Sequence, residues 1–371
     1  MQKNLLYFFL FFVCIMSTAA LSAQYKYKLA NDILFFDQND TIEAPLLGGF
    51  NSPTFAAIDI NLDGKEDLLV LEIFGDILYP FINVGDSGET KYRYDPSYRE
   101  ILPKDLEGYI STADFNCDGK PDLFYTNNNN VKVYENLSTS NKFQLGNSRQ
   151  ITFLNRNYQE KLNLNRIYKP AFADIDGDGD IDILYPLNDQ VAYLKNLSME
   201  RTSQCGLDFE IRAKCWGLFT EQNATSIIFL DTCEMGKDPI NERTKGNKHA
   251  GGTILAFDID GNGTMDLLFG DVSQKHLTLL INGDNTPNRV SSHIISKDES
   301  FPAYDKPIHV NNSPAAYYMD LDNDGLKDLI IAPFNSDPVE PAWTDRLVHV
   351  YKNVGNSVRD SFRFVQDDFL F

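Results

Sequence analysis

The feature that most constrains this chain is an acidic run at residues 174–182, which reads DIDGDGDID. Carboxylates fall at positions 1, 3, 5 and 9 of the run, and glycine stands at position 6. A hard cation such as Ca²⁺ takes six to eight oxygen ligands at about 2.3–2.6 Å. Alternate side chains of a short loop can supply these oxygens, because glycine permits the left-handed turn that the backbone needs. The run therefore predicts a divalent-cation loop.

The same pattern occurs five times, each copy flanked by apolar residues. A single copy is compatible with an ordinary acidic turn, but five copies favour about five bound Ca²⁺ ions. Position 7 would add a carbonyl oxygen, and position 9 would close the shell. The predicted metal ligands are Asp59, Asn61, Asp63 and Asp67; Asp114, Asn116, Asp118 and Asp122; Asp174, Asp176, Asp178 and Asp182; Asp258, Asp260, Asn262 and Asp266; and Asp320, Asp322, Asp324 and Asp328.

The loops are not EF-hands, which need a glutamate at position 12 and a helix on each side. Position 12 is here Val70, Tyr125, Tyr185, Phe269 and Ile331. Each loop is followed by a short apolar run, which predicts a buried strand. Each cation would therefore sit in the connection between two strands.

With these loops the sequence resembles the FG-GAP/VCBS repeat family, the calcium-loop repeats of integrin-α-like β-propellers. The loops match the family pattern at positions 1, 3, 5, 6 and 9 in all five copies, and the resemblance covers roughly residues 25–371. It implies an all-β propeller of four-stranded blades, calcium in each loop, and an extracellular or cell-surface setting. It implies no particular ligand or reaction.

The repeat period supports this fold. The loops begin at Asp59, Asp114, Asp174, Asp258 and Asp320, and a period of about 60 residues suits a propeller blade. A second mark is an asparagine turn after the third strand of each unit, because asparagine tolerates the left-handed backbone of tight hairpins. We expect blades near 55–100, 110–150, 170–250, 254–300 and 315–371, with a cysteine-containing insert at 201–250 and another inserted loop after Ala332.

The number of blades has two interpretations. Integrin-type propellers have seven blades, so resemblance favours a chain that is a fragment ending inside a larger ring. The alternative is a compact five-bladed ring in which an early strand at Tyr25–Leu29 completes the last blade.

Residues 1–23 read as a secretory signal. Lys3 precedes an apolar stretch from Leu5 to Met16, and small residues lead to a preferred cleavage site after Ala23. The apolar stretch is shorter than the roughly 20 residues that span a bilayer. We therefore expect an exported propeller at residues 24–371 with no membrane span after cleavage.

Four cysteines remain after cleavage. Cys117 occupies the variable position 4 of the second loop, and we expect it to be unpaired. Cys205, Cys215 and Cys233 lie in the insert, and Cys215–Cys233 is the preferred bridge, although sequence alone leaves the connectivity open.

The net charge of −20 argues against nucleic acid as a partner, because phosphate binding needs a basic face. The sequence carries no G-x-S-x-G, H-E-x-x-H or glycine-rich phosphate motif, so we expect no enzyme activity. Trp216 and Trp343 lie in or beside the inserts, either packed or exposed for stacking on a sugar. The leading hypothesis is a secreted or cell-surface binding and adhesion module for a glycan or protein. The alternatives are the propeller part of a carbohydrate-active enzyme and a spacer in a large adhesin.

Overall fold

The computed structural model describes residues 35–37, 40–42, 49–221, 228–233, 252–283, 292–310, 313–334 and 346–370. The chain divides into two compact units, Met1–Glu43 and Ala44–Phe371. In the first unit, β1 (Phe35–Asp37) and β2 (Asp40–Ile42) form an antiparallel hairpin. The predicted signal and the expected strand at Tyr25–Leu29 lie outside the described residues.

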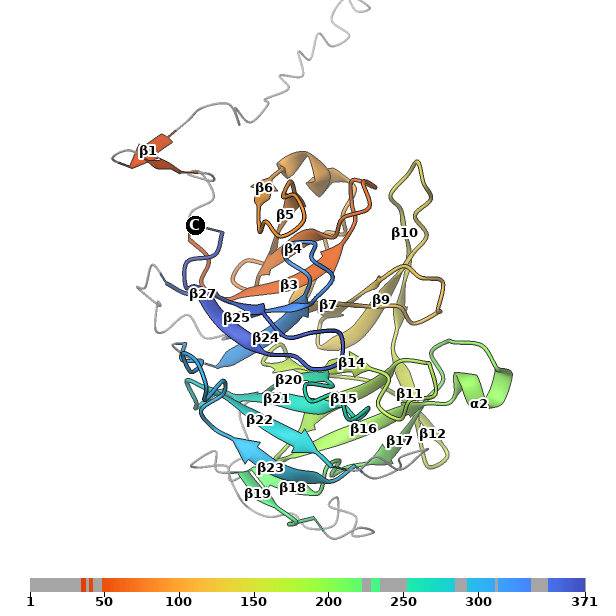
Figure 1. Cartoon of the computed structure of the whole chain (residues 1–371). Coiled ribbons are helices and arrows are strands. Elements are labelled where there is room, and N and C mark those ends of the chain that lie inside the picture. Colours follow the sequence, from red (N-terminus) through yellow and green to blue (C-terminus); the bar gives the residue numbers. More distant parts are fainter. Residues whose placement is uncertain are drawn as a thin grey trace, which may run out of the picture. The chain divides into compact units, whose positions relative to one another are not determined.

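The second unit is a β-propeller of five blades, each an antiparallel sheet with its strands in sequence order (Figure 1). Blade 1 holds β3 (Pro53–Ile58), β4 (Asp67–Glu72), β5 (Ile77–Asn83) and β6 (Tyr92–Tyr94). Blade 2 holds β7 (Glu107–Ala113), β8 (Asp122–Asn127), β9 (Asn130–Asn136) and β10 (Leu145–Gln150). Blade 3 holds β14 (Ala171–Ala173), β15 (Asp182–Leu187), β16 (Gln190–Asn196) and β17 (Phe209–Ala213). Blade 4 holds β20 (Gly252–Phe257), β21 (Asp266–Asp271), β22 (Leu277–Asn282) and β23 (Ile294–Asp298). Blade 5 holds β24 (Pro314–Met319), β25 (Asp328–Pro333), β26 (His349–Asn353) and β27 (Phe362–Gln366).

Several smaller elements extend the blades. The hairpin of β11 (Thr152–Asn155) and β12 (Tyr158–Lys161) adds to blade 3 through a parallel pairing with β17. The strand β13 (Tyr168–Lys169) pairs in parallel with β20 of blade 4. The cysteine-containing insert holds an antiparallel hairpin of β18 (Phe219–Glu221) and β19 (Ile228–Leu230). Two short helices lie in turns. The helix η1 (Pro96–Glu100) follows β6 of blade 1, and α2 (Ser198–Thr202) follows β16, the third strand of blade 3. No helix in the described part of the chain is both long and apolar enough to cross a bilayer.

The second strand of each blade shows why the apolar runs after the loops form strands. In β4, β21 and β25 every residue is buried. A central strand covered on both faces needs apolar side chains on both faces, so its sequence is a continuous run rather than an alternation. In this ring the cover comes from the neighbouring blades.

Five apolar clusters fill the spaces between successive blades, and the first of them closes the ring. It joins Phe55 and Val70 of blade 1 to Tyr317 and Ile330 of blade 5. The first strands β3, β7, β14, β20 and β24 contact one another in a circle, including β24 with β3. Ser52 Oγ also donates to the Pro333 carbonyl oxygen at 3.0 Å across this junction.

The interpretation of the blades as part of a seven-bladed ring is therefore wrong, since blade 5 packs directly on blade 1. The family resemblance predicted the structure of each repeat but not the number of blades. That number depends on how the side chains between neighbouring blades fill the space between their sheets. Blade 5 has four strands of its own, so no early strand is needed to complete it.

The closing junction gives a first prediction. Phe55 is 1% exposed and its ring lies 5.1 Å from that of Tyr317, centroid to centroid, in an edge-on arrangement. We expect Phe55→Ala to lower the free energy of unfolding by about 3–5 kcal/mol, because it opens a cavity between the first and last blades. Urea unfolding followed by circular dichroism measures this change.

The matched control is Val365→Ala on β27, where the side chain is 56% exposed. A surface truncation of this kind changes stability by less than about 0.5 kcal/mol. Equal effects of the two substitutions would show that the ring is not closed by this contact.

Candidate metal centres at the blade junctions

The first aspartate of each acidic loop folds the loop around its own carboxylate. Its Oδ1 accepts the amide of position 5 at 3.1–3.2 Å, and its Oδ2 accepts the amide of the position-6 glycine at 2.8–3.0 Å. All five loops share this geometry, at Asp59, Asp114, Asp174, Asp258 and Asp320. The repeat in sequence is therefore a repeat in backbone structure.

Two positions of each loop adopt the left-handed backbone. The glycines at position 6 have φ between 79° and 97°, as predicted. Position 4 also has positive φ, between 57° and 78°, although it carries a glycine in only two loops. The other three loops place Leu62, Cys117 and Asn323 there. This second turn was not predicted, because its residue type varies.

The aspartate at position 9 joins the loop to the third strand of its blade. It is 0–1% exposed in every loop. Its Oδ1 accepts the backbone amide of the turn asparagine at 2.7–2.9 Å, and its Oδ2 accepts the position-2 amide at 2.9–3.2 Å. The asparagine side chain donates back to the position-8 carbonyl at 3.1–3.2 Å. The two periodic marks of the sequence are thus one hydrogen-bonded unit.

The carboxylates predicted as ligands gather to different degrees. Ligand atoms lie within 4.8 Å of one another for Asp174, Asp176 and Asp178, for Asp258, Asp260 and Asp266, and for Asp320, Asp322 and Asp324. Loops 1 and 2 carry an asparagine at position 3, and among the described residues they do not bring three carboxylates together. Of the five aspartates at position 9, only Asp266 joins such a group in the part of the chain described.

The gathered oxygens fit a cation. Asp176 and Asp322 each keep a buried Oδ1 with no hydrogen-bond partner among the described residues. A buried carboxylate oxygen without a partner is costly, and a cation would remove that cost. The donor set is oxygen only, which suits Ca²⁺ or Mg²⁺ rather than a softer metal. Several acidic clusters of this protein can therefore hold metal ions.

Two lysines also reach these clusters, and sequence reasoning missed them. Lys195 Nζ contacts Asp176 and lies 3.1 Å from Asp178, and Lys352 Nζ contacts Asp322 and lies 3.4 Å from Asp324. Both lysines directly precede the turn asparagine, so the register of that turn could have revealed them. Blades 1 and 4 have Ile82 and Ile281 at this place, and blade 2 has Glu135.

In four of the five loops, position 4 reaches the turn between the third and fourth strands of the next blade. Leu62 packs on the cluster that contains Phe143 of the β9–β10 turn. A Cβ on Gly261 would clash with the Val358 carbonyl in the β26–β27 turn. The Asn323 carbonyl accepts from Ser87 Oγ at 2.9 Å, which joins loop 5 to blade 1. The loops therefore lie at the junctions between blades.

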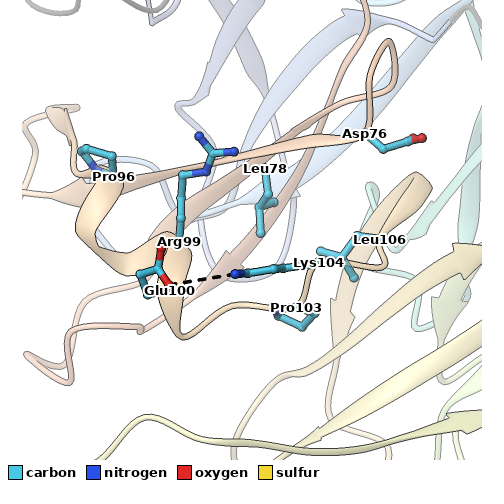
Figure 2. Close-up of a pocket in the computed structure, with 8 residues that line it drawn as sticks. All are labelled: Asp76, Leu78, Pro96, Arg99, Glu100, Pro103, Lys104 and Leu106. Carbon is cyan, nitrogen blue, oxygen red and sulfur yellow. Dashed lines mark ion pairs between the residues drawn. The ribbon is translucent and has the colours of Figure 1, made fainter. Parts of the chain in front are cut away.

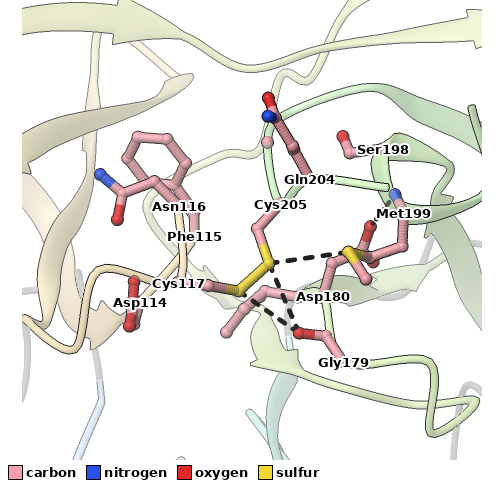
Figure 3. Close-up of a disulfide and its surroundings, with 12 residues drawn as sticks. Asp114, Phe115, Asn116, Cys117, Gly179, Asp180, Ser198, Met199, Gln204 and Cys205 are labelled. Atoms are coloured by element: carbon pink, nitrogen blue, oxygen red, sulfur yellow. Dashed lines mark hydrogen bonds between the residues drawn. A yellow bond between two sulfur atoms is a disulfide. The ribbon is translucent and has the colours of Figure 1, made fainter. Parts of the chain in front are cut away.

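At the second loop this contact is covalent, because Cys117 forms a disulfide with Cys205 after α2 (Figure 3). The prediction that Cys117 is unpaired is wrong. Cys117 has a φ of 57°, and at position 4 it meets the turn of blade 3 that carries Cys205. The two cysteines are 88 residues apart in the sequence, so the local sequence could not reveal their pairing. Cys117 Sγ also lies 3.4 Å from the Gly179 carbonyl oxygen of loop 3. The preferred bridge Cys215–Cys233 is confirmed.

Other candidate binding features are less organised. Trp216 is packed, at 1% exposure, and Trp343 lies outside the described residues. A pocket of about 480 Å³ opens beside η1 and is lined by blade 1, by η1 and by the segment that leads to β7 (Figure 2). Its charged side chains include the exposed pair Lys104–Glu100 at 3.9 Å, and Leu78 and Leu106 supply apolar lining. The pocket contains no residue of an acidic loop.

The fold and the loops define a β-propeller with cation-type hairpin loops at its blade junctions. Residues 114–185, which include the second and third loops, match the family model of the FG-GAP-like repeat. The predicted resemblance is thereby confirmed over these residues, which form part of a five-bladed propeller. A search of curated proteins gives no match.

Solved structures offer distant likenesses at 14–15% identity. A lectin of Agrocybe aegerita, described as recognising non-reducing terminal N-acetylglucosamine, has TM-score 0.38 at 14% identity over 88% of this chain and 70% of its own. The Tc holotoxin pore of Photorhabdus luminescens has TM-score 0.34 at 14% identity, over 82% of this chain and 14% of its own. The V. cholerae biofilm matrix protein Bap1 has TM-score 0.26 at 15% identity, over 86% of this chain and 38% of its own. Likenesses at this level say nothing about a ligand.

The buried aspartates at position 9 predict how stability depends on pH. Burial is the main cause that raises the pKa of Asp67 and Asp122 to about 6, of Asp266 and Asp328 to about 7, and of Asp182 to about 8. The folded, metal-free protein therefore binds more protons than the unfolded chain between about pH 4 and pH 8, so its stability falls as pH rises through this range.

Urea unfolding of protein stripped with a chelating resin measures this effect at pH 5 and pH 8. We expect lower stability at pH 8, and a flatter pH dependence for Asp182→Asn. Higher stability of the stripped wild type at pH 8 than at pH 5 would contradict the account.

The disulfides predict unequal losses of stability. Cys117–Cys205 closes a separation of 88 residues and Cys215–Cys233 one of 18 residues. Loop-closure entropy in the unfolded chain makes the longer bridge more stabilising by about 1.4 kcal/mol. Paired Cys→Ser variants, one for each bridge, measure this by denaturant unfolding. The account fails if removal of Cys117–Cys205 costs the same as removal of Cys215–Cys233, or less.

Proposed function

We propose that this protein is an exported, non-catalytic binding and adhesion module whose propeller is stiffened by calcium in its hairpin loops. The observation that carries the proposal is the common geometry of the five loops. Each folds around its first carboxylate, and three of them gather three carboxylates within 4.8 Å. A structure repeated five times at the blade junctions has a mechanical role more readily than a catalytic one.

The residues at positions 1, 3 and 5, joined in loop 4 by position 9, would hold the ion, and calcium would supply the positive charge that offsets the repulsion among their carboxylates. The hydrogen bond from the position-6 glycine amide to the position-1 carboxylate keeps the loop in a turn before any ion arrives. At position 9, the aspartate fixes the loop to the third strand. These bonds pre-organise the carboxylates, so little loop ordering accompanies binding.

The placement of position 4 extends this effect to the neighbouring blade. Loop 5 contacts Ser87 and Gly88 of blade 1, where the Gly88 amide donates to the Asp322 carbonyl at 2.6 Å. Asp322 is itself one of the gathered carboxylate residues. Holding loop 5 in place therefore also holds the junction that closes the ring. A rigid ring presents its outer hairpins at fixed positions, as a binding surface requires.

The ligand surface would be formed by the hairpins added to the blades. The β18–β19 hairpin carries Phe229, which is 45% exposed, and the β11–β12 hairpin carries Tyr158, which is 75% exposed. Exposed aromatic side chains on hairpins can stack on sugars or pack on a protein partner. We propose a glycan or protein ligand at these positions.

Export is supported by the two disulfides, because structural disulfides persist in oxidising compartments. The signal-like sequence of residues 1–23 points the same way. We therefore propose a location outside the cytoplasm, in the medium or on the cell surface.

Chelation tests the calcium part of the proposal. An ion that binds the folded state and not the unfolded chain raises stability by mass action. We expect the melting temperature to fall on addition of EGTA and to recover with excess Ca²⁺ but less with Mg²⁺, which prefers a tighter octahedral site. An unchanged melting temperature in EGTA would contradict calcium stiffening.

A glycan array, with and without calcium, tests the binding part. We expect calcium-enhanced binding of a glycan class, reduced at least tenfold by Phe229→Ala or by Tyr158→Ala, with no release of reducing ends from the bound polysaccharide. The exposed substitution Val358→Ala, on a different turn, serves as the control. Degradation of the polysaccharide would instead favour a carbohydrate-active enzyme.

A further inference from the structure

We propose that blade 3 binds a second divalent cation, between Asp178, Asp180 and Glu200, beside the ion expected in its loop. The proposal rests on the proposed function, since Asp178 would serve both ions. Ligand atoms of these three residues lie within 4.8 Å of one another. Asp178 also belongs to the group that it forms with Asp174 and Asp176. Two groups of oxygens therefore lie side by side and share one carboxylate.

Asp180 provides the observation that points to a ligand. It stands at position 7, where only the backbone carbonyl is expected to bind, yet its side chain is fully buried. Its Oδ2 accepts the Met199 amide at 3.0 Å, whereas its buried Oδ1 has no hydrogen-bond partner in the described part of the chain. Burial of an unpaired carboxylate oxygen is unfavourable. A cation between Asp178 and Glu200 would give this oxygen its missing partner.

The charge of the region also leaves room for a second ion. Lys195 Nζ contacts Asp176 and lies 3.1 Å from Asp178 and 2.5 Å from Glu200. Lys195 is the ammonium that contacts the five carboxylates of the two gathered groups, namely Asp174, Asp176, Asp178, Asp180 and Glu200, through Asp176, Asp178 and Glu200. Carboxylates at such short separations repel strongly in a partly buried site. One calcium ion and one lysine offset three of these five negative charges, and a second divalent ion would offset the remaining two.

The helix that carries Glu200 is held in place by bonds on both sides. The Asn196 side chain donates to the Gly206 carbonyl at 2.7 Å, and Arg201 pairs with Asp208 at 2.6 Å. The Cys117–Cys205 disulfide then fixes the end of this segment to loop 2. Figure 3 shows Asp180, Met199 and this disulfide around the Gly179 carbonyl. Glu200 is therefore presented to the loop by a braced segment.

Blade 5 offers an internal comparison. It has the same gathered loop, Asp320, Asp322 and Asp324, with Lys352 in the place of Lys195. Its position 7 is Leu326, and the other loops carry Lys65, Lys120 and Thr264 there. Only blade 3 combines an acidic position 7 with a glutamate from the following turn, so the second ion is expected in that blade alone.

Native mass spectrometry of the full chain, equilibrated with CaCl₂, tests the proposal by counting bound ions. We expect Glu200→Gln and Asp180→Asn each to bind one calcium fewer than wild type. Glu200 is 41% exposed at its side chain, so its substitution does not threaten folding. Glu210→Gln, which alters a nearby carboxylate on β17, is the matched control and should keep the wild-type count.

The outcomes separate this inference from the proposed function. If wild type binds calcium and both variants bind the same number of ions, the second ion is ruled out, and Lys195 alone compensates the charge of these carboxylates. Calcium stiffening of the propeller is not affected by that result. If wild type binds no calcium, both proposals fail. A loss of two ions in Asp180→Asn would assign Asp180 to the loop ion and also overturn a separate site. Circular dichroism of each variant confirms that the count refers to folded protein.

Discussion

The buried aspartate that ends each acidic loop is the interaction on which the rest of this propeller depends. One carboxylate oxygen holds the amide at the start of the loop, and the other holds the amide of the asparagine that ends the third strand. The asparagine side chain returns a bond to the residue before the aspartate. A buried carboxylate that accepts two backbone amides satisfies groups that a tight hairpin would otherwise leave unpaired. This unit recurs in every blade, so all five sheets join the loop to the third strand by the same hydrogen bonds.

This unit places acidic loops where successive blades meet, which joins electrostatics to architecture. The apolar clusters supply cohesion between blades, and the loops form contacts near the edge of each junction. At one junction that contact is a disulfide. Lys195 and Lys352 show that the fold already recruits cations to the gathered carboxylates. Divalent ions would act at the same places with more charge and more ligands.

The sequence predicted much of this structure because its strongest signals are local. The spacing of Asp174 to Asp182 and the apolar run after it set a loop and a strand, and the same pattern located five blades. What sequence could not show depends on contacts between distant residues. The pairing of Cys117 with Cys205 needs the turn of the next blade, and the closure of blade 5 on blade 1 needs the packing of Phe55 against Tyr317. The approach of Glu200 to Asp180 likewise depends on how α2 folds back.

The central claim is that cations in the loops stiffen the junctions between blades. Amide hydrogen exchange with and without calcium tests it most directly, because it reports local opening at each junction. The account predicts slower exchange with calcium at the loop amides, including Gly325, and at Ser87 and Gly88 in the blade that loop 5 contacts. Protection confined to the loop, or none at either place, would contradict it.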